Sequence, residues 1–180
     1  MEKPKLIVIG GFAGAGKTTL ANRLSSEHNY SIFSSDKIND ALRLALNREF
    51  KEVSPIAYKV MWLLVREQLS NGVSVIIDTN MAAARTWASL DNIKRDFPEI
   101  NVYPVILQAT LKTHRLRIED RGRTNKEHLN LGGDKLEDVL FKYNFIEKLN
   151  RPDIVRISAE GTPESAYDAV EELILGKQLS

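Results

Sequence analysis

The sequence predicts an α/β fold in which a five-stranded parallel sheet is sandwiched by helices. Short, continuously apolar runs alternate with longer segments of helical periodicity along the chain. Because the apolar runs do not alternate with polar residues, the strands are expected to be covered on both faces, as in parallel sheets between helix layers. Ligands bind such sheets beyond the carboxyl ends of the strands, so the residues that follow each strand are the first candidates for a site.

Each element follows from its own pattern and boundary residues. A buried strand is predicted at 5–9, where apolar residues run into glycine, and a helix is predicted from Lys17 to about Glu27. The other strands are predicted at 30–34, 73–77, 101–107 and 154–157. The other helices are predicted from Asp36 to Leu46, after Pro55 as far as Asn71-Gly72, and at 82–97, 111–120, 135–149 and 163–175. A polar loop is predicted at 121–134.

The composition is that of a globular chain with one domain, residues 1–180. Hydrophobic residues make up 43% and charged residues 27% of the chain. The net charge of +1 does not favour nucleic acid as a partner, although it leaves that class open, and no apolar run is long enough to predict a membrane span. The absence of cysteine fits a reducing compartment, and the first strand begins too early to leave room for a signal peptide. We therefore expect a cytoplasmic protein.

The segment Gly11–Thr18 reads GFAGAGKT and matches the phosphate-binding pattern G-x-x-x-x-G-K-[ST]. It follows a predicted strand and opens a predicted helix, which is the context that this loop requires. Glycines let the backbone approach an oligophosphate, and bared N–H groups and the helix N-terminus attract its charge. Lys17 is expected to reach the β- and γ-phosphates and the Thr18 hydroxyl to bind Mg²⁺. The predicted nucleotide-binding residues here are Gly11, Phe12, Ala13, Gly14, Ala15, Gly16, Lys17, Thr18 and Thr19.

Two aspartates follow predicted strands. Phosphoryl transfer needs a group that orients or deprotonates the acceptor hydroxyl, and Asp36 is placed for that role, with helix capping as the alternative. Asp78 ends the hydrophobic run 73–77 and is expected to hold Mg²⁺ directly or through water. Contact with the acceptor and a purely structural strand-end carboxylate are the alternatives for Asp78.

Basic residues concentrate in one segment, which is predicted to form a lid at about 115–134. Its members are Lys112, Arg115, Arg117, Arg121, Arg123 and Lys126. Arginine forks suit phosphate oxygens, and a segment that closed over ATP would stabilise charge in the transition state. Arg121 is the first candidate for catalysis, and Arg115 and Arg123 are the next candidates for binding phosphate. A solvated charged face is the alternative for most of the six.

These motifs together resemble the small P-loop kinases of the AAA type, the group that includes polynucleotide 5′-hydroxyl kinase domains and zeta-toxin-like kinases. The resemblance spans nearly the whole chain and rests on GFAGAGKTTL, SSDKIND, VIIDTNM and RLRIEDRGR. It implies a fold like that of nucleoside monophosphate kinases, with a short arginine-rich lid. It also implies that Asp36 is the general base, that Asp78 and Asn80 lie near the acceptor or metal, and that a lid arginine contacts ATP.

One position departs from this resemblance. In the family, an arginine often lies three residues after the first aspartate and binds a phosphate of the acceptor, whereas this chain has Asn39 there. Arg43 lies one helical turn further on and is expected to contact the substrate in its place. The departure leaves open whether the acceptor carries a phosphate.

The predicted activity is ATP-dependent transfer of the γ-phosphoryl group to a hydroxyl of a nucleoside, a nucleic-acid 5′ end or a small molecule, with ATP and Mg²⁺ as cofactors. A GTP-binding switch and an NTPase module of a larger assembly are the alternatives. A switch should carry D-x-x-G after the third strand and a base-reading N-K-x-D, whereas this chain has DTNM at 78–81 and NKEH at 125–128.

The remaining distinctive side chains are expected to be structural. The tryptophans and two methionines inside helical or strand-end patterns are predicted to pack in the core, namely Met61, Trp62, Met81 and Trp87. The histidines lack metal-ligand spacing and are predicted to lie at the surface, namely His28, His114 and His128.

Overall fold

The computed structural model of the chain describes residues 3–79, 81, 84–124, 144 and 148–176, with the backbone alone for 121–124. Its strands are β1 (Lys5–Gly11), β2 (Ser31–Ser34), β3 (Val75–Asp78), β4 (Asn101–Gln108) and β5 (Val155–Ser158). Its helices are α1 (Lys17–His28), α2 (Ser35–Leu46), α3 (Phe50–Ser70), α4 (Ala84–Asp96), α5 (Leu111–Thr124) and α7 (Pro163–Leu175).

The five strands form one sheet in the order β2-β3-β1-β4-β5, and all neighbouring pairs are parallel. The predicted five-stranded parallel sheet is therefore confirmed. β1 lies at the centre, where its register pairs Ile9 with Asp78 of β3 and Gly11 with Leu107 of β4. The carboxyl ends of these three strands consequently lie along one edge, where the predicted site residues begin.

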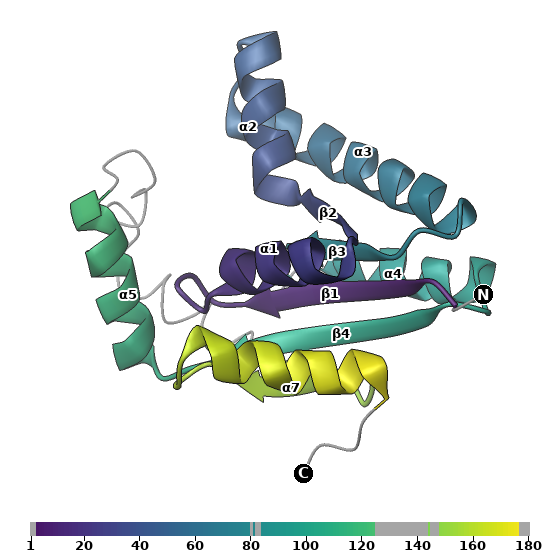
Figure 1. The fold of residues 1–180 in the computed structure, drawn as a ribbon. Coiled ribbons are helices and arrows are strands. Elements are labelled where there is room, and N and C mark those ends of the chain that lie inside the picture. The colour runs from purple at the N-terminus through teal and green to yellow at the C-terminus, as the bar shows by residue number, and fades with distance from the viewer. Residues whose placement is uncertain (1–2, 80, 82–83, 125–143, 145–147, 177–180) are drawn as a thin grey trace.

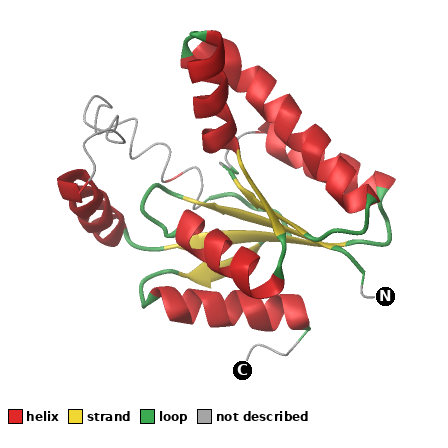
Figure 2. Ribbon diagram, turned by 45° about the horizontal axis from the view of Figure 1, so that its top comes forward, coloured by secondary structure: helices red, strands yellow, loops and turns green. Residues whose placement is uncertain are grey.

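Helices cover both faces of the sheet (Figure 2). On one face, Ile7 and Ile9 of β1 pack in a cluster with Leu24 of α1 and Val170 of α7. On the other face, side chains of β1 pack with α3 and α4, and the cluster includes Met61, Trp62, Met81 and Trp87. The predicted core positions of these tryptophans and methionines are confirmed, because none is more than 7% exposed. Burial on both faces explains why the strands read as unbroken apolar runs.

The start of α3 differs from the prediction. Pro55 does not mark the beginning of this helix but lies inside it. A capping box between Glu49 and Glu52 starts the helix at Phe50, so Pro55 falls in its second turn. The predicted end was correct, because the helix stops at Ser70 and Gly72 has a positive φ of 74°.

The helix α5 is longer than predicted. It continues past Asp120 to Thr124, so the first part of the predicted lid is helical. The single Gly122 costs a helix about 1 kcal/mol, which is too little to end it without a cap or a proline. Residues 125–134 of the predicted lid, and almost all of the predicted helix 135–149, lie outside the described residues.

Helices lie on two sides of the carboxyl ends of the strands (Figure 1). The helices α2 and α3 pack on each other and form an arm that rises from the sheet, while α5 lies beyond the strand ends at the other side. The loop between β1 and α1 lies between them. None of the described helices has both the length and the apolar character that crossing a bilayer would need.

Candidate active site

The loop between β1 and α1 presents an open helix N-terminus. Gly16 caps α1 with a φ of 90°, no side chain bonds to the cap, and no acidic residue lies in the first turn. The N–H groups of this turn carry the partial positive charge of the helix. This arrangement favours an anion at the loop.

Close packing fixes the middle of the same loop. Gly14 has a φ of 79°, and a Cβ at this position would lie 3.0 Å from the His114 carbonyl oxygen and 3.3 Å from Ile118. Only glycine combines this backbone conformation with so little space. The loop is thus seated directly against α5, which links the phosphate-binding segment to the predicted lid.

The end of β3 meets the start of α1. Thr18 Oγ1 donates a hydrogen bond of 2.6 Å to Asp78 Oδ2, across 60 positions of sequence. Asp78 is 7% exposed, and its register beside Ile9 holds it under the loop. Lys17 Nζ donates to the Phe12 carbonyl oxygen at 3.2 Å, so its ammonium group lies over the loop. The fold therefore brings a hydroxyl and a carboxylate into contact at the start of α1, with an ammonium group against the loop that precedes this helix.

Asp36 lies in the first turn of α2, across from these groups. Although it is accessible to solvent, the surrounding protein displaces part of its water, and this desolvation raises the pKa of Asp36. The negative charge of Asp78 also raises this pKa, while Lys17 lowers it. Asp36 thus shares an electrostatic environment with the groups beneath the loop.

Capping does not explain Asp36. Ser34 is the N-cap of α2, and its side chain accepts a hydrogen bond of 3.5 Å from the backbone N–H of Lys37. The Thr79 hydroxyl donates to Ser35 Oγ at 3.2 Å and joins the start of α2 to the end of β3. The alternative of Asp36 as the capping residue is therefore wrong. Its carboxyl lies in the first turn of α2, where a hydrogen bond from Ser35 partly offsets the rise in its pKa.

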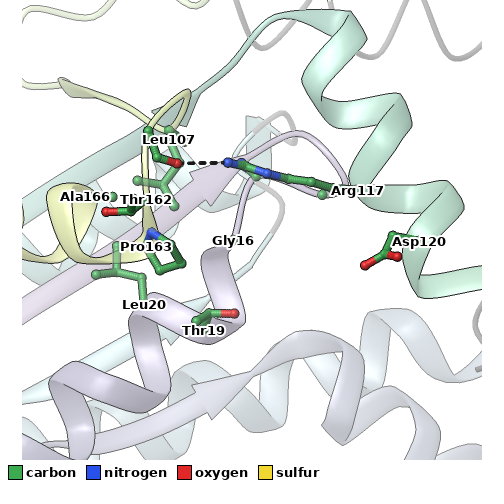
Figure 3. A pocket seen from close by; sticks show the side chains of 13 residues that line it. Gly16, Thr19, Leu20, Leu107, Arg117, Asp120, Thr162, Pro163 and Ala166 are labelled. Carbon is green, nitrogen blue, oxygen red and sulfur yellow. Dashed lines mark hydrogen bonds between the residues drawn. The ribbon is translucent and has the colours of Figure 1, made fainter. Parts of the chain in front are cut away.

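A cavity of about 260 Å³ lies beside the loop, between α1 and α5 (Figure 3). Its walls come from the loop and α1, the end of β4, α5, and the segment between β5 and α7. The lining residues are Gly14, Ala15, Gly16, Thr19, Leu20, Leu107, Arg117, Asp120, Ala159, Gly161, Thr162, Pro163 and Ala166. One arginine therefore faces apolar side chains and a proline next to the phosphate-binding loop.

Hydrogen bonds hold the far wall of this cavity. Arg117 donates to the Gly161 carbonyl oxygen at 3.3 Å, the bond drawn as a dashed line in Figure 3. The Glu160 carboxylate accepts from the Thr113 hydroxyl at 2.7 Å and from the backbone N–H of Thr110. These bonds lower the pKa of Glu160 and tie the segment after β5 to the start of α5.

The predicted basic residues differ in whether they line the cavity. Arg115 is exposed and is not among the residues that line the cavity, whereas Arg117, which was not among the chosen candidates, does line it. Helical spacing contained the signal, because Arg117 lies three residues after His114 and beside Ile118, and all three residues border Gly14. The side chains of Arg121 and Arg123, and all of Asn80, lie outside the described residues.

His114 is buried, so the prediction of a surface histidine was wrong here. It has no exposed surface, and its ring lies edge-on to Phe12 with centroids 5.2 Å apart. Burial, and secondly the charge of Lys17, lower the pKa of His114, so it is neutral at physiological pH. This neutral ring supports the loop from behind.

On the arm, Arg43 and Asn39 have opposite environments. Arg43 is exposed and pairs with Asp40, with 3.8 Å between Nη1 and Oδ1. Asn39 is 5% exposed, and its Oδ1 has no hydrogen-bond partner among the residues that the structure describes.

Known proteins share this architecture. A solved structure of a candidate kinase from Chloroflexus aurantiacus J-10-fl is similar with a TM-score of 0.73 and 17% identity, over 99% of this chain and 100% of that one. Shikimate kinase from Aquifex aeolicus VF5 gives a TM-score of 0.60 and 17% identity, over 95% and 96% of the two chains. A sugar kinase from Janibacter sp. HTCC2649 gives 0.63 and 16%, over 97% and 95%.

These likenesses confirm the P-loop kinase fold. None of the three names is that of a polynucleotide kinase or a zeta toxin, so this narrower relationship stays a prediction. No curated protein matches the chain significantly. A family profile described as AAA domain matches residues 6–146. Because this match spans more than half of the sequence, the protein belongs to the AAA-domain family.

Proposed function

We propose that this protein is an ATP-dependent kinase that transfers the γ-phosphoryl group to a hydroxyl of its acceptor. The observation that carries the proposal is the hydrogen bond between Thr18 and Asp78 beneath an uncapped helix N-terminus. It places a hydroxyl and a carboxylate where the loop would hold the end of an oligophosphate. Asp36, which lies across from them, adds a carboxyl that no cap uses.

The residues present fit a magnesium ion. Thr18 Oγ1 and Asp78 Oδ2 are hard oxygen donors that lie within 2.6 Å of each other, and Mg²⁺ prefers such ligands. These two residues would hold the ion, Asp78 directly or through water. Bound there, Mg²⁺ would neutralise charge on the phosphate oxygens.

The protein's own groups account for the remaining steps. The first-turn N–H groups of α1 and the Lys17 ammonium bind and orient the phosphates. The cavity beside Arg117 and Pro163 accepts the purine base of ATP, because the flat guanidinium group of arginine and apolar side chains suit a flat ring. Asp36 takes the proton of the acceptor hydroxyl as the phosphoryl group moves to it, and its raised pKa suits a general base.

Transfer of label from γ-labelled ATP with Mg²⁺ tests this function. The acceptor panel contains nucleosides, 5′-hydroxyl oligonucleotides, sugars and aminoglycosides, and GTP is run in parallel. We expect label on an organic acceptor, and no transfer by Lys17→Ala. Release of inorganic phosphate with every acceptor unlabelled would indicate an NTPase module, and turnover of GTP alone would indicate a switch.

A further inference from the structure

Asn39 of α2 carries a buried polar group that the fold does not use. The side chain is more than nine-tenths buried, and its Oδ1 has no hydrogen-bond partner in the described part of the chain. A buried acceptor without a partner loses its water and gains nothing in return, so folded proteins rarely keep one. Such a group is a candidate contact for a molecule that is not part of the protein.

Helical spacing places Asn39 beside the proposed base. Asp36 and Asn39 are three residues apart, so their Cβ atoms lie about 5–6 Å from each other on one face of α2. Ser34 pairs with Asp78 in the sheet and Ser35 accepts a hydrogen bond from Thr79, so the first turn of α2 lies beside the end of β3. A molecule whose hydroxyl meets Asp36 would therefore present its neighbouring groups to Asn39.

The charges along α2 do not suit a phosphate on that molecule. Asp36 and Asp40 are both acidic, and Arg43 is exposed and paired with Asp40. Lys37 is exposed and lies about 100° around the helix from Asp36. Arg85 at the start of α4 lies over the Tyr58 ring, 4.5 Å from its centroid. An anionic group beside Asn39 would thus meet a carboxylate and an uncharged amide.

Two buried indoles on the same side of the sheet also lack partners among the described residues. Nε1 of Trp62 and Nε1 of Trp87 have none among the described residues, and both rings belong to the cluster against which Ile38 of α2 packs. An indole donates and an amide oxygen accepts. A hydroxyl group both donates and accepts, so it can serve either orientation of the Asn39 amide.

We propose that Asn39 binds a second, uncharged hydroxyl of the acceptor, which is therefore a polyhydroxyl compound and not a phosphate ester. This inference rests on the kinase function proposed above and defines its acceptor class. Asn39 determines specificity in it, because a site built to bind a hydroxyl rejects an analogue that leaves the amide unpaired.

Paired acceptors test the proposal with γ-labelled ATP. The pairs are D-ribose with ribose 5-phosphate, D-glucose with glucose 6-phosphate, and adenosine with adenosine 3′-monophosphate. We expect label on an unphosphorylated member, with kcat/KM at least about 10-fold above its partner, since one hydrogen bond of about 1.4 kcal/mol gives a factor of ten. A phosphorylated member as the better acceptor would overturn the proposal and leave the kinase function standing.

Two substitutions at Asn39 sharpen this test. Asn39→Leu should raise KM for the polyol about 10-fold, with KM for ATP unchanged. Asn39→Arg should shift the preference toward the phosphorylated member of each pair. Unchanged discrimination in both variants would overturn the role of Asn39.

A stability measurement tests the amide without any acceptor. Asn39→Leu replaces an unpaired buried amide by an apolar group of similar size, so the melting temperature of the free protein should rise by roughly 2–6 °C. Asn92→Leu, on the exposed face of α4, is the matched control for helix propensity. A rise no larger than that of Asn92→Leu, or a fall, would show that the protein itself satisfies the amide. Absence of transfer to every acceptor would instead overturn the kinase function, and the inference with it.

Discussion

Direct hydrogen bonds hold the proposed nucleotide side of the site, whereas the proposed acceptor side keeps a buried polar group without a partner among the described residues. On the nucleotide side, Thr18 bonds Asp78, Glu160 bonds Thr113, and Arg117 bonds the Gly161 carbonyl. On the acceptor side, Oδ1 of Asn39 is buried and unpaired.

The two sides also differ in how tightly they are packed. Gly14 has no room for a Cβ against α5, whereas the arm exposes large apolar side chains, with Leu44 85% and Leu63 66% accessible. A phosphate-binding loop must be shaped before its ligand arrives, because its catalysis depends on positioning. The comparison teaches that a tightly packed loop and a side with an unsatisfied buried group lie on either side of Asp36, the proposed general base.

The largest effect should come from a change in the tightly packed loop. Lys17→Ala removes the ammonium group that neutralises phosphate charge, so we expect ATP turnover to fall by about 10²–10³-fold. Steady-state turnover measures the loss, and an unchanged melting temperature shows that the fold is intact. Turnover equal to that of the wild type would refute the assignment of the loop.

The second effect tests the meeting point of the two sides. Asp36→Asn should reduce phosphoryl transfer by roughly 10²-fold or more and leave ATP affinity nearly unchanged. The base works when deprotonated, so activity falls as the pH drops through its pKa. Because desolvation and Asp78 raise this pKa, the fall in kcat/KM should begin at a higher pH than for an ordinary aspartate.

A pH–rate profile and ATP titration calorimetry together check this prediction. If Asp36→Asn weakened ATP binding as much as it weakened transfer, the residue would belong to the scaffold of the site and not to its chemistry.

A smaller effect is expected at the cavity beside the loop. Arg117→Ala removes one wall of the cavity and its bond to Gly161, so the Kd for ATP should rise about 10-fold while KM for the acceptor stays the same. Lys112→Ala, an exposed position on the same helix, is the control. If Arg117→Ala and the wild type bound ATP with equal affinity, the purine base of ATP would bind outside this cavity.

The smallest effect is expected on the exposed part of the arm. Arg43 is paired with Asp40 at the surface, and such pairs contribute little. Arg43→Ala should therefore change KM for an uncharged acceptor by less than about twofold. A 10-fold rise in KM would show that Arg43 turns to the acceptor, as its spacing from Asp36 suggested, and would weaken the contrast between the two sides.

Much of this molecule could be read from its residues. The order of strands and helices, the parallel sheet, the loop Gly11–Thr18 and the strand-end position of Asp78 follow from local patterns, because apolar runs, glycines and motif spacing act over a few residues. Element ends were less predictable. The capping box at Glu49, and not Pro55, sets the start of α3, and the single Gly122 does not end α5.

By itself, the sequence determined the fold class and the presence of the phosphate-binding motif, since both depend on short-range periodicity and on a motif whose parts are contiguous. Only the tertiary structure decided which side chains meet across long separations. Thr18 bonds to Asp78, and Arg117 rather than Arg115 lines the cavity. His114 and Asn39 are both buried. These outcomes depend on which face of a helix meets its neighbour, and packing sets that face once the whole chain has folded.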